Sequence, residues 1–356
     1  MWFHFESTHK HTQQGKKLCH VLVITWEDVL KGFDSVIAAS FFLFFFLTFF
    51  VFCAFQRCFL FSVLAPLMWR HLLRRLGVAV HPALQREVSR AKDVYGIFCD
   101  ANSVGLDEGE LLCFVPFFHC IAANIAAASP WGPTLMDGVS SYTVAVDGVQ
   151  VEYPKLSAVT TVFCALVLLL EECSLNSYLH WISIEQEIDA DTQRRLGRSA
   201  HAKIEIIKIL NNSIIGVLCE DMSKLGWNIP VEVMSLAHGI CSSRCVDVPR
   251  SNEVFGGPAF VPFVDLINHD DDEPNVAVYV DTMHSLRTLL RRSKTFFQVF
   301  EDDISVDHCP FYVLVRAAKN IAASEELHYR YLDPHDALAG DPLFWASRFH
   351  FCPERH

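Results

Sequence analysis

Two polar segments, about fifty residues apart, carry the side chains best suited by type to do chemistry. In the first, residues 261–275 (VPFVDLINHDDDEPN), an apolar stretch leads into Asp265, Asn268 and His269. The second, residues 321–331 (IAASEELHYRY), has a pair of glutamates and ends at Tyr331. A tyrosine hydroxyl both donates and accepts hydrogen bonds, and it can orient a nitrogen lone pair without ionising because its pKa is about 10.

Each segment alone also has a structural explanation. Asp265 can cap a turn, and Asn268 and His269 can bond to a loop backbone. Tyr331 can pack against a core face, and Tyr329 competes with it for any catalytic role because residues two apart on a strand share a face. The two segments together form a joint pattern that seldom arises by chance, so we interpret them as parts of one site.

The joint pattern resembles the SET-domain protein methyltransferases, in the branch typified by the Rubisco large-subunit methyltransferase. In that branch a Pro-x-x-Asp-x-x-Asn-His block precedes a Gly-Glu-Glu motif and a strand that ends in the catalytic tyrosine. Here the block is Pro262, Asp265, Asn268 and His269. Ser324-Glu325-Glu326 stands at the position of Gly-Glu-Glu, and the fifth residue after Glu326 is Tyr331.

Further motifs extend the resemblance over most of residues 91–351. The front turn Glu-Gly-x-Gly-Leu is matched by Asp93 to Ile97, and Gly109-Glu110 to Pro116 is similar to the strand after it. Glu171-Glu172 and 177–179 resemble the start of a helical insertion, and Ser243-Arg244 matches the Ser-Arg pair that precedes the Asn-His block. The closing aromatic segment is 343–351 (LFWASRFHF).

The resemblance implies an S-adenosyl-L-methionine-dependent protein methyltransferase that acts on a lysine side-chain amine, or alternatively on a histidine. A lysine must lose its proton first, and from a pKa of about 10.4 this costs about 4.6 kcal/mol at pH 7. An apolar channel reduces that cost because it disfavours the ammonium. Tyr331 is the expected catalytic residue, placed to orient the nitrogen.

By the same resemblance, the cofactor is held by a set of loop residues. The expected contacts are Asp93, Val94, Tyr95, Arg244, Asp265, Asn268 and His269. The carboxylate near the front turn suits the ammonium of the methionine portion. We find no metal-binding pattern, since Cys241 and Cys245 lack a second pair at zinc-finger spacing.

Several positions depart from the family pattern. Val94 and Ser324 replace glycines, Leu332 follows Tyr331 where glycine is common, and Phe349-His350 replaces Tyr-Gly in the closing segment. Glycine permits close backbone approach and left-handed conformations that other residues disfavour. These departures support an alternative hypothesis, in which the chain is a catalytically weak or inactive SET-like protein-binding module tethered to a membrane.

The order of patterns along the chain predicts an α+β fold. Short strands are expected over 93–116, helices over 157–170, 189–224 and 231–241, and strands again from residue 260. Runs of strands, then helices, then strands are typical of a sheet with a helical insertion. We therefore predict a SET-type domain over 91–356, with its insertion at about 157–241, preceded by an N-terminal extension over 1–90.

Charge and cysteine content restrict the partners. The formal net charge is −12 at pH 7, which argues against a nucleic-acid binder and favours a basic protein segment as substrate. The 13 cysteines are scattered, often in apolar stretches, which is typical of reduced, buried thiols.

The N-terminal extension contains an uncharged apolar run at residues 35–55 (SVIAASFFLFFFLTFFVFCAF). Its 21 residues match the roughly 20 that a helix needs to cross a bilayer. Arginines are denser after the run, as at Arg70, Arg74 and Arg75, which favours a cytosolic C-terminal domain. Translation from Met68 would remove the run and leave an arginine-rich start, which predicts a cytoplasmic or mitochondrial protein instead.

If residues 35–55 insert as predicted, the full-length protein stays in the membrane pellet after alkaline carbonate extraction. A version beginning at Met68 is the matched control and is expected in the supernatant. Release of the full-length protein into the supernatant would contradict the prediction.

Overall fold

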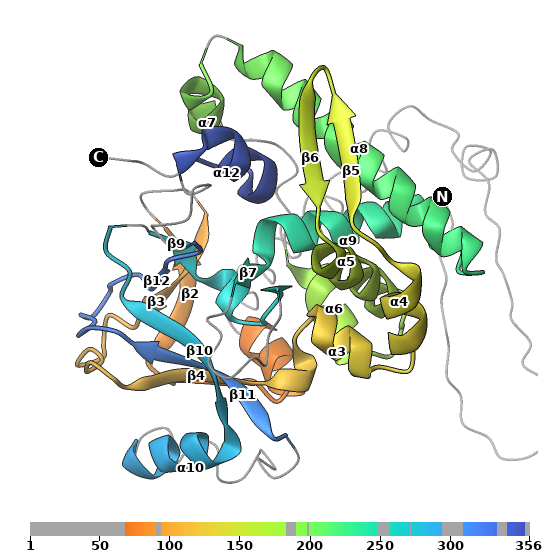
Figure 1. Ribbon diagram of the computed structural model, residues 1–356. Coiled ribbons are helices and arrows are strands. Elements are labelled where there is room, and N and C mark those ends of the chain that lie inside the picture. Colours follow the sequence, from red (N-terminus) through yellow and green to blue (C-terminus); the bar gives the residue numbers. More distant parts are fainter. Residues whose placement is uncertain are drawn as a thin grey trace, which may run out of the picture. The chain divides into compact units, whose positions relative to one another are not determined.

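The computed structural model describes residues 68–89, 94–182, 190–197, 199–247, 257–270, 272–293, 309–332 and 340–352. All of them belong to one compact unit, Pro66–His356 (Figure 1). Asp93, the apolar run at 35–55 and the apolar segment 295–300 lie outside the described residues. No helix among the described residues has the length and apolarity needed to cross a membrane.

A four-stranded antiparallel sheet forms one side of the core. Its strand order is β1 (Ala79–Val80), β4 (Leu111–Pro116), β11 (Phe311–Ala317) and β10 (Val276–Thr282). Every residue of β4 is buried, which fits its continuous apolar sequence. Helix α10 (Met283–Arg292) packs Leu286 and Leu290 against this sheet. Because β1 pairs with β4, the unit includes residues that precede the expected domain start at residue 91.

Smaller sheets build the part of the unit that carries the two polar segments. Strands β2 (Leu84–Val88) and β3 (Tyr95–Cys99) form an antiparallel hairpin. Strands β9 (Asn268–His269) and β12 (His328–Tyr329) pair in parallel, and β7 (Val246–Asp247) pairs with β8 (Pro258–Ala259). Leu327 N donates to Ile97 O at 2.7 Å, so the segment that leads into β12 also bonds to β3.

Helices fill the middle of the sequence and gather beside the sheets (Figure 1). A helix at 68–75 and the 3-10 turn η1 (Phe117–His119) come first. The other elements are α3 (Ala123–Ala128), α4 (Gly132–Gly138), the hairpin β5 (Tyr142–Val146) and β6 (Val149–Tyr153), α5 (Lys155–Leu168), α6 (Ser174–Trp181), α7 (Ala190–Arg195), α8 (Ala200–Lys224), α9 (Val231–Arg244) and α12 (Pro342–Phe349). Helix α5 is apolar on nearly all sides because it is the central buried helix, and it packs against α9, α3 and α6.

The predicted order of strands, helices and strands is observed, and the unit mixes short strands with helices as expected for an α+β fold. One local expectation is wrong. The apolar segment 260–267 is not a strand: it contains the 3-10 turn η2 (Val264–Leu266), which begins after Phe263 adopts a positive φ of 76°. A bulky residue is rarely found at positive φ, so the sequence gives no local signal for this turn.

Ser324 also has a left-handed backbone, with φ of 64°, at the position where the related motif has glycine. Replacing Ser324 by glycine removes the Cβ that disfavours this conformation, so we expect Ser324→Gly to raise the free energy of unfolding by about 0.5–1 kcal/mol. Ser213→Gly inside α8 is the matched control and is expected to lower it by about 0.5 kcal/mol. Urea denaturation midpoints measure both, and a loss of stability in both variants would contradict the explanation.

Candidate active site

The structure brings the two polar segments together. In the parallel pairing of β9 with β12, His328 lies beside Asn268 and Tyr329 beside His269. The backbone N–H of Tyr331 donates to Nδ1 of His269 at 3.2 Å, and the two rings are 5.0 Å apart. Since Nδ1 accepts this bond, the neutral imidazole carries its hydrogen on Nε2. Tyr331 is therefore in direct contact with the Asn268–His269 pair, although Tyr331 and His269 are 62 residues apart in the sequence.

Tyr331 is held as a neutral phenol whose oxygen can accept a hydrogen bond. Its hydroxyl donates to the backbone oxygen of Ile267 at 2.7 Å. Burial raises the pKa of Tyr331 above its usual value, so the group stays protonated at neutral pH. With its hydrogen committed to a carbonyl, the oxygen retains lone pairs for an N–H group. The residue lies two positions beyond the end of β12, not on the strand as the sequence pattern suggested.

Tyr329, the competing tyrosine, is 6% exposed and lies within β12. Tyr331 is more accessible and faces the closing aromatic segment, with its ring 5.2 Å from that of Phe349. The His269 ring lies 4.6 Å from Trp345 and 5.9 Å from Phe351. Aromatic side chains from α12, together with Phe351 two residues beyond its end, thus surround one side of the contact between His269 and Tyr331.

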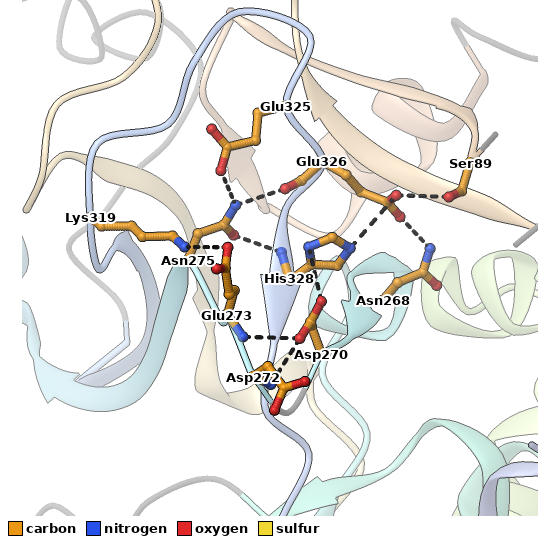
Figure 2. Close-up of polar contacts among 10 residues, drawn as sticks. All are labelled: Ser89, Asn268, Asp270, Asp272, Glu273, Asn275, Lys319, Glu325, Glu326 and His328. Atoms are coloured by element: carbon orange, nitrogen blue, oxygen red, sulfur yellow. Dashed lines mark hydrogen bonds and ion pairs between the residues drawn. The ribbon is translucent and has the colours of Figure 1, made fainter. Parts of the chain in front are cut away.

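The amide of Asn268 is fixed in one orientation. Its Nδ2 donates to Glu326 Oε1 at 2.6 Å (Figure 2). It also donates to the backbone oxygen of Tyr95 at 3.3 Å. Both partners only accept hydrogen bonds, so the nitrogen must face them and Oδ1 faces away. No hydrogen bond from the described residues reaches Oδ1. Asn268 Oδ1 is therefore left as an acceptor.

Gly96 allows this close approach. A Cβ at this position would lie 2.3 Å from Glu326 Oε1 and 2.8 Å from Asn268 Nδ2. The glycine of the front turn is thus required because the hairpin β2–β3 passes directly over the pair Asn268–Glu326. The neighbouring Tyr95 is 52% exposed, and the Arg86 guanidinium lies 3.9 Å from its ring centre.

Asp265 and Arg244 support the site from behind. Asp265 is buried, and its Oδ1 accepts a hydrogen bond from the Tyr178 hydroxyl at 2.7 Å. Arg244 Nη1 donates to the backbone oxygen of Asp265 at 3.0 Å. The Tyr178 oxygen also accepts from the backbone N–H of Phe263 at 3.2 Å. These bonds hold the turn that leads to Asn268.

Burial raises the pKa of Asp265 to about 6, although Arg244 and the Tyr178 hydroxyl act in the opposite direction. Loss of hydration therefore outweighs the nearby positive charge. Because Asp265 is buried and Arg244 bonds to its backbone, the structure gives both residues a role in positioning the turn.

Two predicted cofactor contacts remain, Val94 and Asp93. Val94 accepts a backbone hydrogen bond from Ser89 N at 2.6 Å, while Asp93 lies outside the described residues. Sequence reasoning did not assign Ser89, Glu326 or Tyr178 to the site. Glu326 and Tyr178 lay in recognised motifs, but only the fold shows which residues they contact. No group of three His, Cys, Asp or Glu side chains in the described ranges is arranged to hold a metal ion.

No family model and no curated protein matches the sequence. Solved structures do match the fold. The SET domain of LSMT bound to lysine and AdoHcy superposes with a TM-score of 0.52 at 14% identity, covering 81% of this chain and 57% of that chain. The LSMT SET domain bound to MeLysine and AdoHcy gives 0.51 at 14% identity, covering 81% and 56%. Rubisco LSMT bound to AdoMet gives 0.50 at 13% identity, covering 82% and 57%.

These matches define the fold of this unit as that of a SET domain. The chain spans less than two thirds of the length of the solved structures that it matches.

The raised pKa of Asp265 predicts a pH-dependent stability. The folded state binds the proton more tightly than the unfolded chain, whose value is 3.8, so the free energy of unfolding falls as pH rises from about 4 to about 6. The asparagine in Asp265→Asn cannot ionise, so its contribution to stability does not fall with pH. Between pH 4 and pH 7 we expect the free energy of unfolding of this variant to rise by roughly 3 kcal/mol relative to that of the unmodified protein.

Urea denaturation at the two pH values measures this gain. Asp221→Asn is the control, because a hydrogen bond from Tyr142 lowers the pKa of Asp221, so this variant should show no such gain. An unchanged difference between Asp265→Asn and the unmodified protein at both pH values would refute the pKa assignment.

Proposed function

We propose that this protein is an S-adenosyl-L-methionine-dependent protein methyltransferase that transfers a methyl group to a lysine side-chain amine. The observation that carries the proposal is the contact between His269 and Tyr331, which joins an acceptor hydroxyl to the Asn268–His269 turn. SET domains solved with AdoMet, AdoHcy and lysine bound support the same assignment for this fold.

The residues present fit the methionine portion of this cofactor. Asn268 Oδ1 is a directed acceptor, as a ligand ammonium requires, and Gly96 lets the hairpin β2–β3 approach the Asn268–Glu326 pair that fixes this direction. Asn268 and His269 would hold the cofactor with Tyr95 and the preceding Asp93 and Val94. Arg244 and Asp265 would keep the turn in place.

Bound S-adenosyl-L-methionine supplies a methyl group already activated by the positive charge on its sulfur. The protein therefore has to align the amine and exclude water rather than provide a strong acid. The Tyr331 oxygen would accept an N–H of the neutral amine and direct the nitrogen lone pair. It would not remove the proton itself, because burial raises its pKa and keeps it a phenol.

The aromatic side chains around Tyr331 favour a neutral amine. Trp345 and Phe349 are buried, and Phe351 is partly buried beside them. A lysine ammonium is poorly solvated next to such rings unless it lies over a ring face, so an apolar approach lowers the lysine pKa. The net charge of −12 supports a basic protein segment as the substrate.

Replacing Tyr331 by phenylalanine removes the orienting hydroxyl and leaves the ring packing in place. We expect Tyr331→Phe to reduce methyl transfer about a hundredfold, with cofactor affinity nearly unchanged. Transfer of labelled methyl groups to a protein extract measures the methyl transfer. Calorimetry with S-adenosyl-L-methionine measures the cofactor affinity. Tyr279→Phe, on β10 in the four-stranded sheet, makes the same change away from the site and should transfer normally.

The outcomes separate the hypotheses. Equal transfer by Tyr331→Phe and the unmodified protein would remove Tyr331 from its role. Cofactor binding without transfer to any protein would favour a SET-like binding module, and no cofactor binding would reject the proposal. A histidine target is distinguished by pH: a lysine loses its proton progressively up to about pH 10, whereas a histidine is already neutral above about pH 7.

A further inference from the structure

Glu326 is the centre of a small polar network next to the site. Its Oε1 accepts from Asn268 Nδ2 at 2.6 Å, and its Oε2 accepts from Ser89 Oγ at 2.8 Å. His328 Nε2 lies 3.7 Å from Oε2, and its Nδ1 lies 3.9 Å from Asp270 Oδ2. Figure 2 shows the carboxylate between Ser89 on one side and Asn268 on the other. The Glu326 side chain is 11% exposed.

The network determines which end of the Asn268 amide faces the ligand. An ionised carboxylate only accepts hydrogen bonds, so the amide must turn its NH₂ group toward Glu326. Although burial opposes ionisation, hydrogen bonds from His328, Asn268 and Ser89 lower the pKa of Glu326. The side chain therefore remains an acceptor at neutral pH, and Asn268 keeps its Oδ1 directed outward.

We propose that Glu326, supported by Ser89, is a positioning residue that holds the Asn268 carbonyl oxygen toward the cofactor. This inference rests on the proposed function for the identity of the cofactor, but not for the contact itself. Ser89 connects the network to the front turn, because its backbone N–H also donates to Val94 O. The end of β2, the front turn and the Asn268–His269 turn are thereby linked through one carboxylate.

The inference predicts a specific effect of glutamine at position 326 on the orientation of the Asn268 amide. In Glu326→Gln the amide oxygen is expected to stay toward Ser89 and His328, which both donate to this side of the native carboxylate, and the Gln NH₂ then faces Asn268. Two NH₂ groups cannot bond to each other, so the Asn268 amide is expected to rotate and accept from the glutamine. Asn268 would then present a donor to the ligand ammonium. A conservative substitution would invert the polarity of the site.

A swap of the two side-chain types tests this directly. Asn268→Asp places two carboxylates at the 2.6 Å contact, where they share one proton and repel each other as pH rises. Combining Asn268→Asp with Glu326→Gln restores one donor and one acceptor between residues 268 and 326 in reversed positions, and again leaves an oxygen facing the ligand. The bond from residue 268 to the Tyr95 oxygen is lost in this variant. Glu273→Gln is the control: it makes the same change in the loop after Asn268, where the side chain is 82% exposed and lies 3.6 Å from Lys319 Nζ.

The first measurement is calorimetry of the full-length protein with S-adenosyl-L-methionine. We expect Glu326→Gln to weaken binding at least about tenfold, Glu273→Gln to change it less than about threefold, and the double variant to regain part of the loss. A Glu326→Gln variant that binds as tightly as the unmodified protein, or a double variant no better than Glu326→Gln alone, would overturn the inference.

The second measurement is the urea midpoint of the same variants without any ligand. Asn268→Asp is expected to be less stable at pH 8 than at pH 6, and Glu326→Gln in the same chain should remove that pH dependence. Absence of this rescue would overturn the contact between residues 268 and 326. If Glu326→Gln removes the pH dependence but the unmodified protein does not bind S-adenosyl-L-methionine, the contact is supported and the proposed function is rejected.

Discussion

The parallel pairing of β9 with β12 is the contact on which the candidate site depends. Each strand has only two residues, so the pairing itself provides few hydrogen bonds. It is reinforced by Asn275, which is 1% exposed and bonds to His328 through both its backbone and its side chain. Asn275 Nδ2 also donates to Glu325 Oε1 and to the backbone oxygen of Glu326. One buried amide thus substitutes for the strand partners that a two-residue ladder lacks. Because the segment that leads into β12 bonds to β3 through Leu327, the front turn, the Asn-His turn and the tyrosine are held in fixed positions relative to one another.

The polar groups of the site are divided between two environments. Glu326 accepts hydrogen bonds from Asn268 and Ser89, which lower its pKa and keep it an acceptor. Asp265 is buried deeper, and there the loss of hydration outweighs its one hydroxyl partner and nearby arginines. The strained backbone of Phe263 lies beside this buried carboxyl, and its N–H reaches the same Tyr178 oxygen. Strain of this kind persists where surrounding contacts determine the conformation. Tyr178 on α6 therefore links the helical part of the unit to the turn that presents Asn268.

The sequence predicted the longer elements and the meeting of the two polar segments. Strands β10 and β11 and helices α5, α8 and α9 have enough residues for their apolar patterns to be recognised. Two-residue strands carry no periodicity, so β9 was expected to be a loop and β12 was predicted only through the motif that contains it. The end of β12 before Tyr331 and the 3-10 turn in an apolar segment had no local signal. The contacts of Glu326 and Tyr178 join residues far apart in sequence, and such contacts follow from the fold rather than from spacing.

The glycine departures bear on whether this SET fold is active, and the structure separates conformation from chemistry. Ser324 and His350 have left-handed backbones, with φ of 64° and 62°, at positions where related motifs have glycine. The chain therefore keeps the glycine-like geometry and accepts a penalty of about 1–2 kcal/mol at each residue. Val94 retains the backbone oxygen that accepts from Ser89 N, and Gly96, where a Cβ would collide with Asn268, is still glycine. At Ser324 and His350 the substitutions thus act on stability, while Tyr331 and the Asn268–His269 turn remain in contact. For this reason these departures are weaker evidence against catalysis than the sequence alone implies. Gly96 is the position where loss of glycine would disturb the candidate site most, and it is still glycine.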